Sequence, residues 1–229
     1  MFYIDPVYLW YVFIPVLVIS VGVQLYLRAT FTKWSKVRNS PGLAGVQVAR
    51  ALFDRTPLQP IRVEHVSGNL SDHFDPAANV VRLSDSTARV NSVSAMAITA
   101  HELGHVQQYQ TGSALIRARG VLMPALRFSP MVSYVGILLG LWFNMTGLLW
   151  VGIIFFGLMV LFSILTLPIE IDASRRAMRL LSEAGLLSSL EDEKGSRAVL
   201  RAAAMTYLAA AVTSILQLLY YISVARRRS

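Results

Sequence analysis

The sequence predicts a mainly α-helical integral membrane protein with about four transmembrane helices and one small α+β domain. Of its 229 residues, 55% are hydrophobic and only 15% are charged, whereas soluble domains carry about 25% charged residues. The mean hydropathy is +0.52. Long uncharged runs flank a single stretch of soluble character, residues 28–121. The length therefore allows one compact domain plus a few membrane spans.

The first uncharged run covers residues 7–27, which is long enough to cross a hydrocarbon core of about 30 Å. The segment before it is acidic rather than basic, and no small-residue cleavage site follows it, so a permanent anchor is favoured over a signal peptide. Arg28, Lys33 and Lys36 follow the run. Because basic residues mark cytoplasmic flanks, the N-terminus is expected outside.

The soluble stretch has the pattern of an α+β domain. Ser40 and Pro41 suit the cap and the first turn of a helix. Two short β-branched runs enclose a segment rich in glycine, proline and asparagine, as expected for strands separated by turns. The elements expected here are a helix over 40–55, strands over 61–66 and 80–84, and a helix over 92–110.

Residues 128–169 carry no charge, and one helix of that length would measure about 60 Å, twice the hydrocarbon thickness. A transmembrane hairpin that turns near residues 144–147 is therefore expected. Residues 202–225 form a further apolar run before Arg226–Arg228. The predicted segments are an anchor (1–27), a soluble domain (28–121), the hairpin (122–169), a polar helix (170–201) and a last transmembrane helix with a basic tail (202–229).

The composition excludes several classes of function. The chain has no cysteine, which rules out disulfides, thiolate zinc sites and a cysteine nucleophile. Its net charge is +8, but no groove-reading motif is present, so we expect the lipid bilayer rather than nucleic acid as the partner of these charges. The expected spans contain no charged residues, which argues against a transporter or channel.

The helix expected over 92–110 contains the candidate metal-binding and catalytic residues. It contains His101, Glu102 and His105 in the order HExxH. Residues four apart share one helical face, so the two imidazoles can hold one zinc ion. Glu102 flanks the same face and can reach a zinc-activated water, as in metallohydrolases. The alternative is a polar helix whose histidines only form hydrogen bonds.

A catalytic zinc needs a third protein ligand. The extended motif with a third histidine six residues after His105 is absent. The remaining histidines are His65 and His73, and two carboxylates, Glu170 and Asp172, stand where the apolar hairpin gives way to a polar helix. For His65, on the same strand face as apolar neighbours, a structural role is favoured. The residues alone leave the choice of ligand open.

Several stretches of the chain carry a resemblance. HExxH followed far downstream by Glu-x-x-Ala-Ser is the gluzincin arrangement, and the chain is similar in this respect to membrane proteases of the Ste24/HtpX type. It resembles more closely the neutral zinc metallopeptidase family of bacterial membrane proteins (YugP-like), which implies a zincin-like metalloprotease domain. The stretches are SPGLAGVQVAR, LSDHFDP, VRLS, SVSAMAITAHELGHVQQ, LPIEIDASRRA and RAAAMTYLAA.

Carried over to these positions, the resemblance implies His101, His105 and Glu170 as ligands of one Zn²⁺ per chain, with Glu102 as the general base. Asp172 is then either a residue that orients a ligand histidine by accepting its free N–H or a carboxylate favoured by a helix start. The neighbouring arginines, 175 and 176, are either partners of Asp172 or positive-inside charges, and the second role is favoured.

Topology supplies an independent check, since Glu170 can meet His101 only on the same side of the membrane. A hairpin between them satisfies this condition. Arginines on both flanks place the ends of the hairpin in the cytoplasm, and the protein is expected in the cell (inner) membrane. One feature disagrees: if the last helix crosses fully, Arg226–Arg228 fall outside. That helix either crosses fully or is tilted or partial.

The sequence therefore predicts a membrane-bound zinc metalloendopeptidase acting on a peptide or membrane-protein substrate. His73 is expected to act as a donor to the oxyanion, or else to rigidify a turn. The strand over 80–84 either offers an edge to the substrate or is fully paired within the domain. The alternatives for function are a non-enzymatic, metal-stabilised membrane scaffold or regulator of another protease, and a zinc hydrolase for other bonds.

Overall fold

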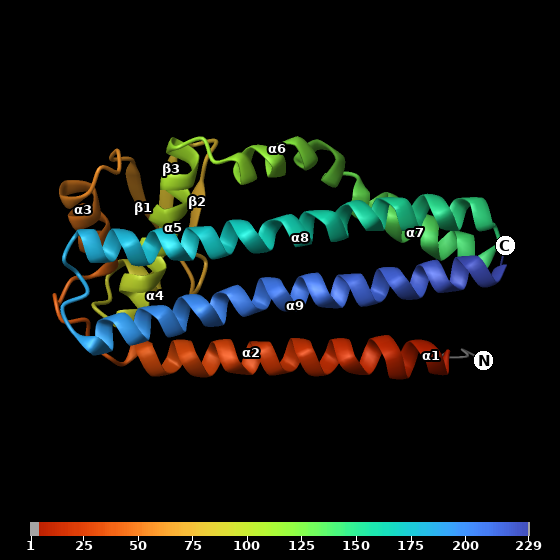
Figure 1. The fold of residues 1–229 in the computed structure, drawn as a ribbon, viewed down its shortest axis with the longest axis horizontal. Coiled ribbons are helices and arrows are strands. Elements are labelled where there is room, and N and C mark those ends of the chain that lie inside the picture. The colour runs from red at the N-terminus through yellow and green to blue at the C-terminus, as the bar shows by residue number, and fades with distance from the viewer. Residues whose placement is uncertain (1–4, 229) are drawn as a thin grey trace. The chain divides into compact units, whose positions relative to one another are not determined.

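The computed structural model describes residues 5–228, so the first four residues of the predicted anchor and the last residue of the predicted tail lie outside the described residues. The chain divides into two compact units, whose elements are labelled in Figure 1. Unit 1 comprises Met1–Gln24, Arg117–Pro168 and Thr206–Ser229, and unit 2 comprises Leu25–Ile116 and Ile169–Met205.

Long apolar helices confirm a mainly α-helical membrane protein. Within residues 5–228, three helical stretches are long and apolar enough to cross a membrane, or four if the bent pair α6–α7 counts as one span. The bend between these two helices is 50°. The helices concerned are α1 (Pro6–Tyr8), the π-helical η1 (Leu9–Phe13) and α2 (Ile14–Ser35), which together span Pro6–Ser35, then α6 (Ala114–Leu126), α7 (Ser129–Trp142), α8 (Thr146–Glu183) and α9 (Leu190–Arg228).

In unit 1, a short turn joins α7 and α8 near the residues where the hairpin was expected to turn. The turn between them contains Asn144, which has a φ of +54°, a conformation that asparagine adopts more readily than most residues. The two helices approach closely at Gly136 and Gly152, where a Cβ on Gly136 would lie 2.9 Å from the Gly152 backbone. Small residues commonly permit such close packing of membrane helices.

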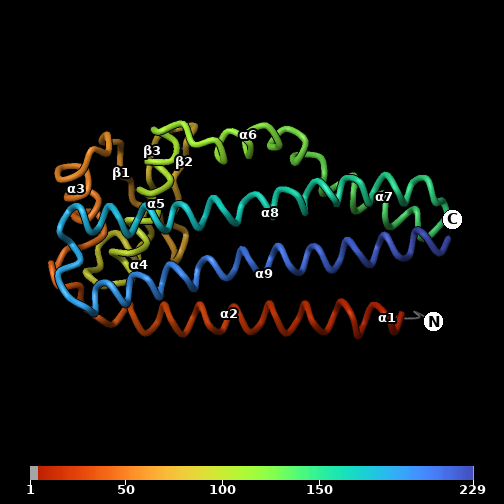
Figure 2. The backbone as a smooth tube through the Cα atoms, viewed as in Figure 1, coloured from red at the N-terminus to blue at the C-terminus, as the bar shows by residue number. Residues whose placement is uncertain are grey.

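The C-terminal end of α9 lies beside the α7–α8 turn (Figure 2). Arg228 donates a hydrogen bond to the Leu141 carbonyl at 3.0 Å and another to Asn144 Oδ1 at 3.3 Å. Tyr220 donates to Asp5 at 3.0 Å, near the start of the first helix. Helix α9 thus reaches the same end of unit 1 as the hairpin turn, which favours a full-length last span over a partial one.

Unit 2 contains a three-stranded sheet with the order β1-β3-β2. Strand β3 (Val80–Ser84) pairs in parallel with β1 (Arg62–Val66) and antiparallel with β2 (His73–Asp75). The expected strands over 61–66 and 80–84 are confirmed, whereas β2 falls in the segment expected to form turns. Because β3 is central and paired on both sides, it offers no free edge to a substrate. The short helix α4 (Asp85–Ala88) follows β3 directly.

The helix expected over 40–55 begins five residues later than predicted. Helix α3 is Gly45–Arg55, and its cap residue is Ala44, so the prediction that Ser40 caps it was wrong. Asn39 is the cause: its side chain accepts from Leu43 N and donates to Leu43 O, both at 2.9 Å, and so closes a turn before the helix. The Ser40 amide instead donates to Asp192 at 3.0 Å.

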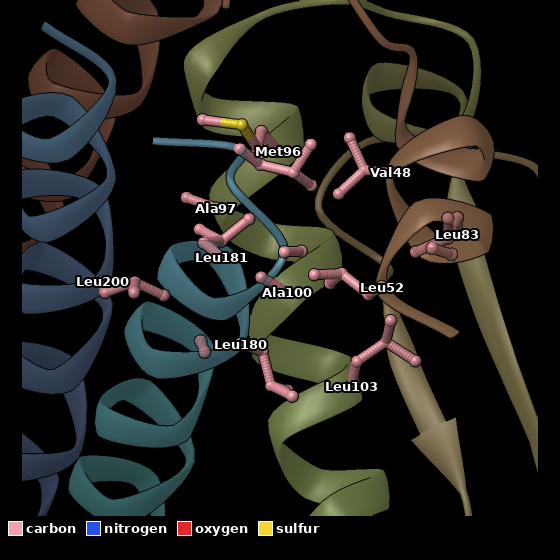
Figure 3. Close-up of a cluster of buried hydrophobic side chains, with 14 of the residues drawn as sticks. Val48, Leu52, Leu83, Met96, Ala97, Ala100, Leu103, Leu180, Leu181 and Leu200 are labelled. Carbon is pink, nitrogen blue, oxygen red and sulfur yellow. The ribbon is translucent and has the colours of Figure 1, made fainter. Parts of the chain in front are cut away.

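The core of unit 2 surrounds α5 (Val93–Gln110), the helix expected over 92–110. Ser92 accepts a hydrogen bond from Ala95 N and caps this helix. Figure 3 shows α5 between two sets of apolar side chains, from α3 and β3 on one side and from α8 and α9 on the other. The residues labelled there are Val48, Leu52, Leu83, Met96, Ala97, Ala100, Leu103, Leu180, Leu181 and Leu200. Burial on two sides holds α5 firmly against α8.

Candidate metal centre

Three side chains from two helices of unit 2 converge on one point. His101 and His105 lie one turn apart on α5, and Glu170 lies on α8. Glu170 Oε2 is 3.2 Å from His101 Nε2 and 3.5 Å from His105 Nε2. One ligand atom of each residue lies within 4.8 Å of those of the other two. The structure thus brings Glu170, rather than His65 or His73, to the histidine pair.

The outward nitrogens of both rings have partners of their own. His101 Nδ1 is 3.3 Å from the Ser174 hydroxyl on α8, and His105 Nδ1 is 2.9 Å from Gln108 Oε1 on α5. These contacts leave both Nε2 atoms on the side of Glu170. Neither Ser174 nor Gln108 was predicted, although Gln108 lies one helical turn after His105, a spacing that places the two side chains together.

Glu102 lies directly after the first histidine and is buried, with 8% of its surface exposed. Burial raises the pKa of its carboxyl group, while the neighbouring His101 and His105 oppose that shift. Within residues 5–228, no side chain or backbone group forms a hydrogen bond with this carboxylate. A buried acid with a raised pKa and free acceptor positions has the properties required of a general base.

Asp172 lies near the histidines but contacts neither ring in the described part of the chain. Its Oδ2 accepts from Gln108 Nε2 at 2.7 Å and from Arg176 Nε at 2.8 Å. Arg176 also donates to Gln107 and Thr111 at the end of α5, at 3.3 and 3.4 Å. Arg176 is therefore a partner of Asp172, the role that the sequence disfavoured.

The other two histidines belong to the sheet. His73 lies in β2; its Nδ1 is 2.8 Å from the Ser71 carbonyl and its Nε2 is 3.4 Å from Arg82 on β3. His65 Nε2 is 2.7 Å from Asp85. Neither belongs to the group of metal-ligating side chains found in the described residues. The role of His73 as an oxyanion donor stays a prediction.

Helices α5 and α8 are in close contact at Gly104, in the middle of the HELGH stretch. A Cβ on Gly104 would lie 2.4 Å from the backbone oxygen of Ala173, a distance that no real Cβ contact allows. Ala173 lies three residues after Glu170 on the same helix. Glycine at position 104 therefore lets the carboxylate of α8 come within reach of both histidines.

The substitution Gly104→Ala should push α8 away from α5, destabilise the protein by about 1–3 kcal/mol, as overpacking of a well-packed interior does, and weaken metal binding. Unfolding in detergent with parallel metal analysis measures both effects. Gly157→Ala on α8 is the matched control, because within residues 5–228 no atom beyond its chain neighbours and its own helix backbone lies within 4 Å of a Cβ there. Equal stability and metal content in the two variants would contradict the close-contact explanation.

The donor set fits a zinc ion. Zinc in catalytic sites takes three protein ligands, commonly two histidines and a glutamate, and keeps one position open. Ligand bonds of about 2.0–2.1 Å in a tetrahedron place neighbouring ligand atoms about 3.3 Å apart, which compares well with the separations of 3.2 and 3.5 Å between Glu170 and the two rings. The centre is therefore a candidate zinc site in a mainly α-helical membrane protein.

Comparison with known proteins agrees with a zinc site in a membrane protein. Residues 9–226 match the family described as "Putative neutral zinc metallopeptidase". The chain is also 36% identical, over 211 residues, to the "Putative membrane protease YugP" of Bacillus subtilis (strain 168), covering 92% of this chain and 93% of that protein. The protein belongs to this zinc metallopeptidase family. No solved structure was found to match the chain.

Proposed function

We propose that this protein is a membrane-bound zinc endopeptidase of the HExxH gluzincin type. The observation that supports it best is the convergence of His101, His105 and Glu170 beside the buried carboxylate of Glu102. A metal-stabilised scaffold would need the three ligands, but it would have no use for a buried acid without a protein donor, whose burial is costly.

In this proposal, His101, His105 and Glu170 hold one zinc ion, which when bound polarises a peptide carbonyl and makes water more acidic. Glu102 accepts the proton of the attacking water and delivers it to the leaving amine. Burial raises the pKa of the Glu102 carboxyl group, which makes its carboxylate a stronger base toward the proton of the water. Ser174 and Gln108 hold the histidine rings in place.

We also propose that an extended substrate segment pairs with β2. This strand is at the edge of the sheet, and no other strand within residues 5–228 pairs with its outer side. Phe74 of β2 packs against Tyr109 of α5, with ring centroids 5.8 Å apart, so the strand adjoins the helix that bears both histidines. Edge pairing recognises a peptide backbone with little regard to sequence.

The catalytic part in this proposal comprises residues 28–121 and 170–201, on the cytoplasmic side of the cell membrane. Glu170 directly follows the uncharged run that ends at Ile169, so the third ligand lies where a transmembrane helix leaves the apolar core. Arginines that precede and follow the hairpin favour a cytoplasmic location for both of its ends.

The test is metal analysis and peptide hydrolysis with the purified, detergent-solubilised protein. We expect one zinc per chain and cleavage of an unfolded protein such as casein, with product termini mapped by mass spectrometry. Zinc without turnover on any peptide would favour the scaffold or a hydrolase of other bonds. Absence of any bound divalent cation would refute the proposal.

A further inference from the structure

Gln108 is a fully buried polar side chain that joins the two helices of the metal centre. None of its surface is exposed. From α5 it contacts His105 on its own helix at 2.9 Å, and on α8 it contacts the Ile169 carbonyl at 2.9 Å and Asp172 at 2.7 Å. Every polar atom of the side chain thus has a partner, although burying an amide is costly unless it is hydrogen-bonded.

The orientation of this amide is determined by its partners on α8. The Ile169 carbonyl and the Asp172 carboxylate are both acceptors, so the amide group must present its NH₂ to them. If the amide were reversed, its oxygen would face two other oxygens. Arg176 adds to this constraint by donating to the same Asp172 oxygen, which keeps that acceptor in place.

The Gln108 oxygen must therefore point toward His105. A carbonyl oxygen carries no proton, so the hydrogen bond to His105 requires a proton on Nδ1. A neutral imidazole protonated on Nδ1 has its lone pair on Nε2, which is the nitrogen on the side of Glu170. The buried amide selects the tautomer that a metal ligand needs.

We propose that Gln108 is a positioning residue for the metal centre: it fixes the tautomer and ring orientation of His105, and Asp172 acts on that histidine only through Gln108. This inference rests on the proposed zinc-binding function. It differs from direct orientation of a histidine by a carboxylate, because an amide is interposed and the carboxylate serves to prevent its reversal.

His101 has a weaker counterpart. Its Nδ1 meets the Ser174 hydroxyl at 3.3 Å, and a hydroxyl can either donate or accept. Ser174 can therefore adapt to either tautomer of His101, whereas Gln108 can serve only one tautomer of His105. Removal of the Gln108 side chain should consequently lower the zinc affinity more than removal of the Ser174 hydroxyl does.

The test measures zinc affinity by competition with a chelator of known affinity, together with the visible spectrum of the Co²⁺-substituted protein. Gln108→Leu should weaken zinc binding about 10- to 100-fold, the usual cost of losing a group that orients a metal ligand, and should change the Co²⁺ spectrum. Ser174→Ala should weaken zinc binding less than Gln108→Leu does. Gln110→Leu on the same helix is the control, because Gln110 is exposed and its side chain forms hydrogen bonds with Gln59, away from the histidines.

A second pair of variants keeps the test decisive if Gln108→Leu does not fold. An asparagine side chain can still accept from Gln108 and Arg176 through one oxygen, whereas Asp172→Leu removes one of the two acceptors that orient the Gln108 amide. Asp172→Asn should therefore lose much less zinc affinity than Asp172→Leu. Zinc affinity and a Co²⁺ spectrum like wild type in Gln108→Leu, or in Asp172→Leu if Gln108→Leu does not fold, would overturn the inference. If the wild-type protein binds zinc and cleaves peptides in that case, the proposed function stands without it.

Discussion

Replacing Glu102 with glutamine should lower kcat/KM for peptide cleavage by about 10²- to 10⁴-fold, the usual contribution of a general acid–base group. Glutamine has nearly the same shape, and Glu102 is buried and lies beside the histidines without belonging to the group of ligands. Zinc content and folding should therefore be preserved. The expected result is a protein that binds zinc but has lost turnover, measured with a fluorogenic peptide and metal analysis.

The control for this variant is Glu191→Gln, which makes the same change at an exposed position in the first turn of α9. It should behave like wild type in both measurements. If Glu102→Gln cleaves as fast as wild type, the carboxylate takes no part in proton transfer. A loss of zinc along with activity would instead mean that residue 102 contributes to metal binding.

Replacing Glu170 with glutamine should weaken zinc binding at least about 100-fold, because even groups that only orient a ligand contribute 10- to 100-fold. The carboxylate oxygen that lies between both rings would be replaced by a neutral amide. An amide oxygen is a poorer zinc ligand, and the amide NH₂ cannot bind the metal at all. Titration against a chelator measures the loss, and cleavage should fall with it at limiting zinc.

Glu183→Gln is the matched control for this variant. Glu183 is the last residue of α8 and is exposed, so the same substitution on the same helix leaves the centre untouched. Zinc affinity like wild type in Glu170→Gln would show that the third ligand is another residue. The two histidines would then form only an ion pair with Glu170.

The membrane helices of this protein could be predicted from hydropathy, because whether a segment can enter a bilayer depends on the residues of that segment itself. A bilayer tolerates few charges, so uncharged runs mark the helices, and an uncharged run twice the required length implies a hairpin. In the structure, a short turn joins α7 and α8 near the residues where the hairpin was expected to turn. The course of the last helix was open, because the charges of Arg226–Arg228 disagreed with the other basic flanks. The hydrogen bonds of Arg228 with the turn between α7 and α8 favour a full-length last helix over a partial one.

Errors in the soluble part arose where side chains compete with local propensity. Ser40 is a good helix cap, yet the Asn39 side chain closes a turn that delays the helix to Gly45. Strand β2 has only three residues, too few for a periodic pattern to reveal it, and it forms because β3 offers it a partner. Both outcomes depend on groups that only the folded chain brings together.

The sequence by itself determined the membrane class and the pairing of His101 with His105, because a spacing of four residues on a helix places two side chains on one face whatever surrounds them. From the residues alone, four candidates remained for the third ligand. The tertiary structure brings Glu170 to the histidine pair, through the packing of α8 against α5 at Gly104. It also revealed that Asp172 reaches His105 through Gln108. Contacts between residues some 60 positions apart depend on packing, which no local pattern encodes.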